Sequence, residues 1–138
     1  MNVFLDTNIL LDALVERSEP MFLKNAETIF ALGENGVVDL YMSVLSIPTI
    51  AYVLKNMTSE RKKSIIRDLT SIVEPLPSYP EHVRNMLEQQ MADIEDALQV
   101  QSALEGQCDI IVTRNLQDFR DSAIPAISPD DFLARIIN

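Results

Sequence analysis

The sequence of 138 residues is poor in glycine, cysteine and histidine. Its three glycines form neither a GxGxxG nor a GxxxxGK[ST] arrangement, so a nucleotide site built on a glycine loop is not expected. One cysteine, Cys108, excludes an internal disulfide and is expected to be an inert buried side chain. The chain also lacks a signal-like leader and any apolar run long enough to span a bilayer, so we expect a cytoplasmic protein without membrane contact.

Positive charge is scarce as well. Eleven Lys and Arg residues face 21 Asp and Glu residues, which gives a net charge of -10. Such a chain is not expected to attract nucleic acid over its whole surface, because that attraction needs clustered basic residues. The main basic cluster, residues 61–63 with Arg67 and Lys55, could guide RNA, although a solvated helix face explains it more simply. Any action on nucleic acid should therefore be local and depend on metal ions at acidic positions.

What the sequence does contain is an alternation of short apolar runs with longer helical patterns. Its length and its 47% hydrophobic content predict a single globular domain over residues 1–138. Expected strands are 2–6, 38–43, 73–77, 109–113 and 124–128. Expected helices are 8–16, 21–36 with Gly33 and Gly36 as its stop, 46–56, 58–72, 79–89, 93–106 and 129–137, the last capped by Ser128. This alternation predicts an α/β fold with a parallel sheet covered by helices.

Polar residues follow two of the predicted strands at the point where each strand ends. Asp6 closes the first strand, and Thr113, Arg114, Asn115 and Asp118 follow the fourth. Ligands of parallel sheets bind outside the carboxyl ends of the strands, so these residues meet there if the two strands are neighbours.

A helix start adds three more carboxylates, Asp93, Glu95 and Asp96. Clustered carboxylates repel one another unless a cation lies among them, and hard oxygen ligands favour Mg²⁺ or Mn²⁺. Structural alternatives remain open at each position. Asp6 with Thr7 and Asn8 could cap a helix, Asp93 could be a plain N-cap, Asp96 could favour a helix dipole, and Asp118 could be a loop residue or another cap.

These residues are where the chain resembles the PIN domains. The resemblance runs from "FLDTNILLDAL" through "DLYMSVLSIPTIAYVL" and "DIEDALQVQSAL" to "DIIVTRNLQDF" and "IPAISPDDFL". It implies a three-layer α/β/α fold with a central five-stranded parallel sheet. It also implies a Mg²⁺- or Mn²⁺-dependent ribonuclease of the VapC toxin type, paired with an antitoxin and expected to form a homodimer.

The family's functional positions can be carried over one by one. The catalytic and metal-binding acids would be Asp6, Asp96 and Asp118. Asp118 would replace the usual acid at Asn115, three residues earlier. The supporting positions would be Thr7, Asn8 and Thr113 as polar groups that hold the strand ends, and Arg114 as either a phosphate contact or a solvated side chain.

One position departs from the family pattern. Thr49 stands where the family usually has a Glu, so a charge is missing from the second metal position; Glu95 could compensate for it. The expected function is an endoribonuclease that leaves a 5′-phosphate and a 3′-hydroxyl and acts as the toxin of a toxin–antitoxin pair. The alternative is a catalytically weak or inactive PIN-like module that binds nucleic acid or protein.

A phosphoryl-transfer domain with Asp6 as nucleophile is disfavoured, because its second Asp would fall at Asn8. The lone histidine, His82, lies far along the chain from the strand ends and is expected on the surface of a helix.

Overall fold

The computed structural model describes residues 1–15 and 19–137. In this part of the chain five strands form one parallel sheet in the order β3-β2-β1-β4-β5. The strands are β1 (Asn2–Leu5), β2 (Asp39–Ser43), β3 (Val73–Leu76), β4 (Ile110–Val112) and β5 (Ala126–Ile127). The helices are α1 (Thr7–Leu14), α2 (Pro20–Glu34), α3 (Ser46–Val53), α4 (Ser59–Thr70), α5 (Pro80–Leu87), α6 (Ile94–Glu105) and α7 (Pro129–Ile137), with a 3₁₀ turn η1 (Leu116–Phe119). The predicted α/β class and parallel sheet are confirmed.

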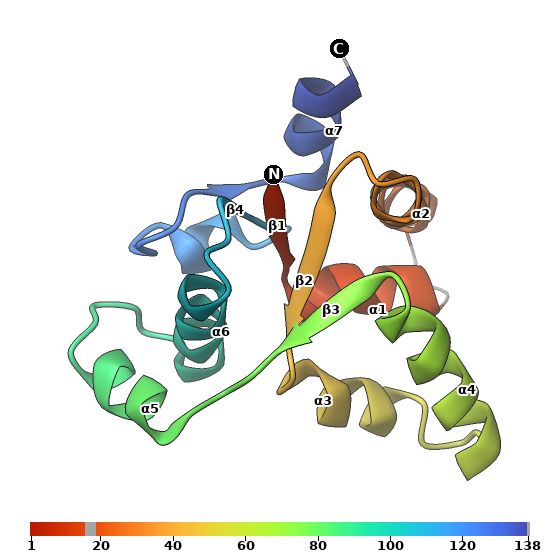
Figure 1. Cartoon of the computed structure of the whole chain (residues 1–138), viewed down its shortest axis with the longest axis horizontal. Coiled ribbons are helices and arrows are strands. Elements are labelled where there is room, and N and C mark those ends of the chain that lie inside the picture. The colour runs from red at the N-terminus through yellow and green to blue at the C-terminus, as the bar shows by residue number, and fades with distance from the viewer. Residues whose placement is uncertain (16–18, 138) are drawn as a thin grey trace.

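Helices cover both faces of the sheet, which gives three layers. Helices α5 and α6 lie on one side, and α1, α2 and α4 lie on the other (Figure 1). The alternation of side chains along β1 explains this arrangement. Val3 and Leu5 pack into a core with α1, α2 and α7, whereas Phe4 packs into a second core with α6 and η1.

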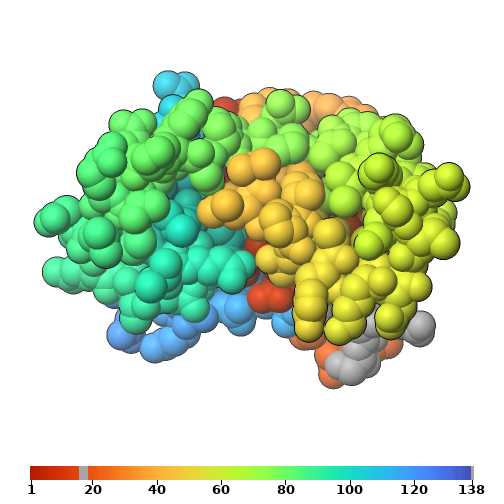
Figure 2. All heavy atoms as spheres, turned by 90° about the horizontal axis from the view of Figure 1, so that it is seen from below, coloured from red at the N-terminus to blue at the C-terminus, as the bar shows by residue number. Residues whose placement is uncertain are grey.

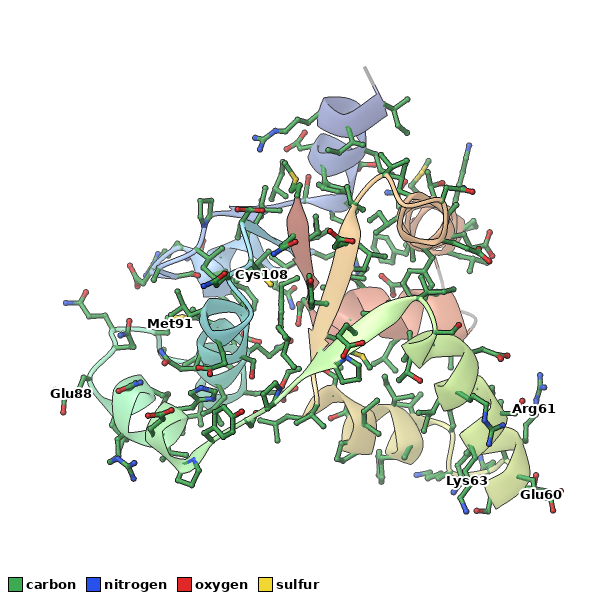
Figure 3. The ribbon with its side chains drawn as sticks, viewed as in Figure 1. Glu60, Arg61, Lys63, Glu88, Met91 and Cys108 are labelled. Atoms are coloured by element: carbon green, nitrogen blue, oxygen red, sulfur yellow. The ribbon has the colours of Figure 1, made fainter. Side chains whose placement is uncertain are left out.

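The second core also contains the single cysteine. Cys108 is buried just before β4, beside α6 (Figure 3). Burial raises the pKa of its thiol to about 12, with a smaller contribution from the charge of Asp109. The side chain is therefore a protonated, unreactive thiol, as the sequence predicts.

Most predicted helices and strands are present, with ends shifted by a few residues. Of the two glycines predicted to stop helix α2, Gly33 lies inside the helix, which ends at Glu34. The chain turns at Gly36, which has a positive φ of 72°. Helix α1 ends at Leu14, and Glu16, at the end of the predicted helix, lies outside the described residues. The predicted cap of α7 is confirmed, because the Asp131 N–H donates to Ser128 Oγ at 3.2 Å. None of the helices in residues 1–15 and 19–137 combines the length and apolar character needed to cross a membrane.

The strand order places β1 at the centre of the sheet, between β2 and β4. The carboxyl ends of β1 and β4 therefore meet at the same edge. Figure 2 views the molecule from this edge, where red atoms from the start of the chain lie in a hollow between α3 (orange to yellow) and α6 (teal).

Candidate metal centre

A pocket of about 250 Å³ lies at this edge of the sheet. It gathers residues from four separate segments of the chain: Asp6, Thr7, Asn8, Leu11, Thr49, Asp93, Glu95, Asp96, Asn115 and Asp118. Five of these ten residues carry a carboxylate, and none is a Lys, Arg or His. The predicted site residues from the first strand, the helix start and the segment after the fourth strand are therefore brought together.

Asp6 directly follows β1 and is 2% exposed. It occupies the N-cap position of α1, but its side chain does not cap that helix. Instead its two oxygens accept hydrogen bonds from other elements, Oδ2 from the Thr113 hydroxyl at 2.8 Å and Oδ1 from the Gln99 amide at 3.1 Å. The capping interpretation of Asp6 is thus wrong, and the Thr113 hydroxyl instead holds this carboxylate from the end of β4.

Asp96 enters the pocket from the first turn of α6. Its backbone N–H donates to Asp93 Oδ1 at 2.9 Å, which confirms Asp93 as the N-cap. Asp93 also lines the pocket. The side-chain amide of Gln99, which also donates to Asp6, donates to Asp96 Oδ1 at 3.2 Å. One amide nitrogen of Gln99 therefore bridges Asp6 and Asp96.

The charges of the pocket are poorly balanced. Burial raises the pKa of Asp96 from 3.8 to about 7. Repulsion from four neighbouring carboxylates adds to this effect, those of Asp6, Asp93, Asp118 and Glu95. Burial also raises the pKa of Asp6, although the hydrogen bonds from Thr113 and Gln99 oppose that rise. A divalent cation would relieve this repulsion, and hard carboxylate oxygens are the ligands that Mg²⁺ and Mn²⁺ prefer.

Three further residues complete the rim of the pocket. Asp118 lies exposed on η1, Asn115 is exposed just before it, and Thr49 presents a hydroxyl from α3. In the described part of the chain, no three carboxylates of this pocket have ligand atoms all within 4.8 Å of one another. The exposed position of Asp118 leaves its side chain free space on the solvent side of the pocket.

Arg114 is a predicted site residue that does not line the pocket. Its guanidinium pairs with Asp12 of α1 through Nε at 2.8 Å and Nη2 at 3.2 Å. It also lies over the Phe22 ring, with Cζ at 4.0 Å from the ring centroid. Asp12 is 1% exposed, so this ion pair ties α1 and α2 to the end of β4. The sequence predicts a solvated or phosphate-binding Arg114, whereas the structure shows Arg114 in an ion pair with Asp12. The buried Asp12 carboxylate needs such a cation.

The prediction for His82 is also wrong, because this side chain is only 3% exposed. The Tyr79 N–H donates to its Nδ1 at 3.2 Å, so Nε2 carries the proton and faces Glu105 Oε2 at 3.5 Å. With Glu81 these residues form a second ionisable group at the far end of α6. A metal at Nε2 would require the proton to sit on Nδ1, where the Tyr79 N–H already points. The group therefore joins α5 to α6 and does not offer a ready metal site.

Sequence reasoning missed Gln99 and Asp12. Gln99 lies three residues after Asp96, a spacing that places two side chains on the same helix face. It also interrupts the buried apolar positions Ala97, Val100 and Ala103. Asp12 likewise interrupts an apolar helix. A polar residue in a buried helical stripe is the available signal, but it does not identify the partner across the fold.

Comparison with known structures gives the same architecture. VapBC2 from Rickettsia felis, solved bound to a DNA fragment from its promoter, superposes with a TM-score of 0.64 at 20% identity, covering 93% of this chain and 98% of that chain. VapBC-1 from nontypeable Haemophilus influenzae gives 0.64 at 21% identity, covering 94% and 99%. A toxin–antitoxin complex from Klebsiella pneumoniae gives 0.64 at 18% identity, covering 92% and 97%. At these identities the similarity establishes a shared fold.

Sequence comparison supplies the family. No curated protein matches the chain. The family model of the PIN domain matches residues 2–117. This range includes four of the five acidic pocket residues and all but the final strand of the sheet. The chain therefore belongs to the PIN domain family.

Proposed function

We propose that this protein is an endoribonuclease that depends on Mg²⁺ or Mn²⁺. The observation that carries the proposal is the acidic pocket at the carboxyl edge of the sheet, where Asp6, Asp96 and Asp118 converge and no basic side chain of the described residues lines the wall. PIN domains are in general nucleases, and the match of this chain to that family supports the proposal. The net charge of -10 favours a cation between protein and phosphate, because two negative groups repel each other without one.

The division of labour follows from burial and hydrogen bonding. A bound divalent ion would supply Lewis-acid stabilisation of the phosphodiester and of the leaving oxygen. Asp6 and Asp96 would hold it from the floor, and Asp118 would close over it from the exposed 3₁₀ turn. The Thr113 hydroxyl keeps Asp6 in place through its bond to Oδ2. Asn8, Asn115, Thr49 and Glu95 lie on the pocket wall, where they would orient water or the RNA backbone.

We further propose that the protein is the toxin of a toxin–antitoxin pair. The structures that it resembles include toxin–antitoxin complexes, and the superposition covers at least 92% of this chain in each case cited above. An antitoxin protein is therefore the proposed partner, and a homodimer in the cytoplasm is the expected form of the chain without it.

A second candidate is a PIN-like binding module with little or no catalysis. It is favoured by Thr49, which contributes a hydroxyl to the pocket where the family pattern has a carboxylate. The two candidates differ in one measurable property. Both tolerate metal binding, but only the enzyme hydrolyses RNA.

The deciding experiment measures cleavage of single-stranded RNA with Mn²⁺, with Mg²⁺ and with EDTA. We expect cleavage by the wild type with metal and at least about a 100-fold loss for Asp6→Asn, because that change removes a metal-binding charge at the floor of the site. Asp39→Asn is the matched control, since Asp39 is exposed at the start of β2, the opposite edge of the sheet. Metal-independent cleavage, or equal activity in Asp6→Asn, would contradict the nuclease proposal. Metal binding without cleavage would favour the binding module.

A further inference from the structure

Gln99 is a deeply buried polar side chain that contacts two acids of the candidate metal centre. It is 1% exposed and lies in the second turn of α6. Its amide nitrogen donates to Asp6 Oδ1 at 3.1 Å and to Asp96 Oδ1 at 3.2 Å. Two acids from different parts of the fold, one directly after β1 and one at the start of α6, therefore share one donor group.

The other end of the same amide fixes its orientation. Gln99 Oε1 accepts from the Thr7 N–H at 3.3 Å and from the Thr7 hydroxyl at 3.4 Å. Thr7 is the first residue of α1, so its N–H has no partner within its own helix. The carboxylates can only accept and the Thr7 N–H can only donate, so the amide can satisfy both sides in one orientation. Its position is fixed at both ends before any ion binds.

We propose that Gln99 is a positioning residue for the metal ion, holding Asp6 and Asp96 at a spacing that lets both bind it. This inference rests on the proposed function, since it assumes that the acidic pocket takes a divalent cation. Gln99 itself is not a ligand, because its nitrogen carries no lone pair for a metal. Each carboxylate oxygen has two lone pairs, so the hydrogen bonds leave capacity for coordination.

The neutral amide is chemically suited to this role. A Lys or Arg in its place would also bridge two carboxylates, but its charge would cancel the attraction of the pocket for a cation. A Glu would add a further negative charge and lose the donors. An apolar residue would leave both carboxylates without the bridge, so their mutual repulsion would act on the side chains without restraint. Only a neutral donor both restrains the acids and preserves their charge.

The test compares Mn²⁺ binding to the full chain by electron paramagnetic resonance, which counts free and bound Mn²⁺ without requiring activity. Gln99→Met keeps the length of the side chain and removes both polar atoms. We expect the dissociation constant for Mn²⁺ to rise roughly 10- to 100-fold, the usual effect of losing a group that orients a metal ligand. Gln101→Met is the matched control: Gln101 is also buried on α6, at 5% exposure, and does not line the acidic pocket.

A second variant guards against loss of folding. Gln99→Asn keeps the amide but shortens the side chain by one methylene, so it cannot reach both acids, and we expect a weaker rise in the dissociation constant than for Gln99→Met. Circular dichroism reports whether each variant is folded. Unchanged Mn²⁺ binding in both folded Gln99 variants, or an equal loss in Gln101→Met, would overturn the role of Gln99 alone. Absence of Mn²⁺ binding in the wild type would overturn the metal site and this inference with it. Binding without RNA cleavage would overturn only the proposed nuclease.

Discussion

Helix α6 gathers ionisable side chains at both of its ends, and the two groups differ in how their charges are satisfied. At its start Asp96 faces Asp6 and other carboxylates across the pocket. At its end Glu105 faces His82 of α5. The helix rise separates Asp96 from Glu105 by about 13 Å, so the two groups are independent.

The group at the end of α6 has a complete set of partners. His82 accepts from a backbone N–H on one side and faces a carboxylate on the other. The group at the start has more acceptors than donors, and this excess helps to raise the pKa of Asp96 to about 7. A cluster of ionisable residues is therefore not evidence of a site in itself. An excess of buried charge of one sign is stronger evidence, because folding retains it only against a cost.

The largest expected effect contrasts the removal of one carboxylate charge at the start of α6 with the removal of one at its end. Asp96→Asn should weaken Mn²⁺ binding by at least about 100-fold and abolish RNA cleavage, because it removes a proposed ligand. Glu105→Gln, its counterpart at the other end of the helix, should leave both properties unchanged. Calorimetric titration with Mn²⁺ and an RNA cleavage assay measure the pair. Equal effects of the two variants would show that the pocket is not the metal site.

The group around His82 should matter for stability alone. His82→Leu preserves the volume of the buried side chain but removes both of its polar contacts. We expect the free energy of unfolding to fall by about 1–2 kcal/mol, from the loss of these bonds at the start of α5. Urea denaturation measures this change. A rise in the Mn²⁺ dissociation constant of His82→Leu would mean that the two ends of α6 are coupled after all.

The sequence allowed the fold and the acids to be predicted for a common reason. Buried parallel strands are continuous apolar runs, so a polar residue at the end of one stands out, as Asp6 does. The strand order then brings distant strand ends together by a general rule of parallel sheets. The start of α6 could also be predicted, since Asp93 and Asp96 have the spacing of an N-cap residue and a residue of the first helical turn.

Pairs of residues that lie far apart in the sequence and meet in the interior could not be predicted in this way. Arg114 and His82 carry charge or polarity that normally indicates a surface position, but each has a partner on a different element, Asp12 of α1 or Glu105 of α6. Such pairs depend on the packing of α1 against β4 and of α5 against α6. A local pattern in the sequence does not encode that packing, so both residues were placed wrongly and Gln99 was missed.

Substitution of Thr49, which lies on α3 and lines the acidic pocket, can increase the excess of negative charge in that pocket. Thr49→Glu would add a carboxylate to the wall of the pocket. We expect tighter Mn²⁺ binding, by roughly tenfold, because affinity rises with the number of charged oxygen ligands. The melting temperature of the metal-free protein should fall, because the new charge repels the others. Thr49→Gln, which adds similar bulk without charge, is the control. If both variants bind Mn²⁺ alike, charge at this position does not set the affinity.

The smallest effect is the pH dependence of metal binding. Asp96 has a pKa of about 7 in the folded, metal-free protein, so below pH 7 a proton competes with the ion. A single competing proton predicts that Mn²⁺ affinity falls about fivefold between pH 7 and pH 6 and changes little above pH 8. Asp96→Asn should remove most of this dependence from whatever binding remains.

The stability of the metal-free protein should vary in the opposite sense. The pKa of Asp96 is higher in the folded state than its ordinary value of 3.8, so the folded state binds the proton more tightly than the unfolded chain. Its contribution to stability is present in full below about pH 4 and is lost as the pH rises toward 7. Saturating Mn²⁺ should cancel this loss by holding the carboxylate in its charged form. Thermal denaturation from pH 5 to pH 8, with and without Mn²⁺, measures both trends. A metal-free stability that rises through this range in the wild type but not in Asp96→Asn would mean that Asp96 is a stabilised carboxylate rather than a strained one, and the case for a cation beside it would fail.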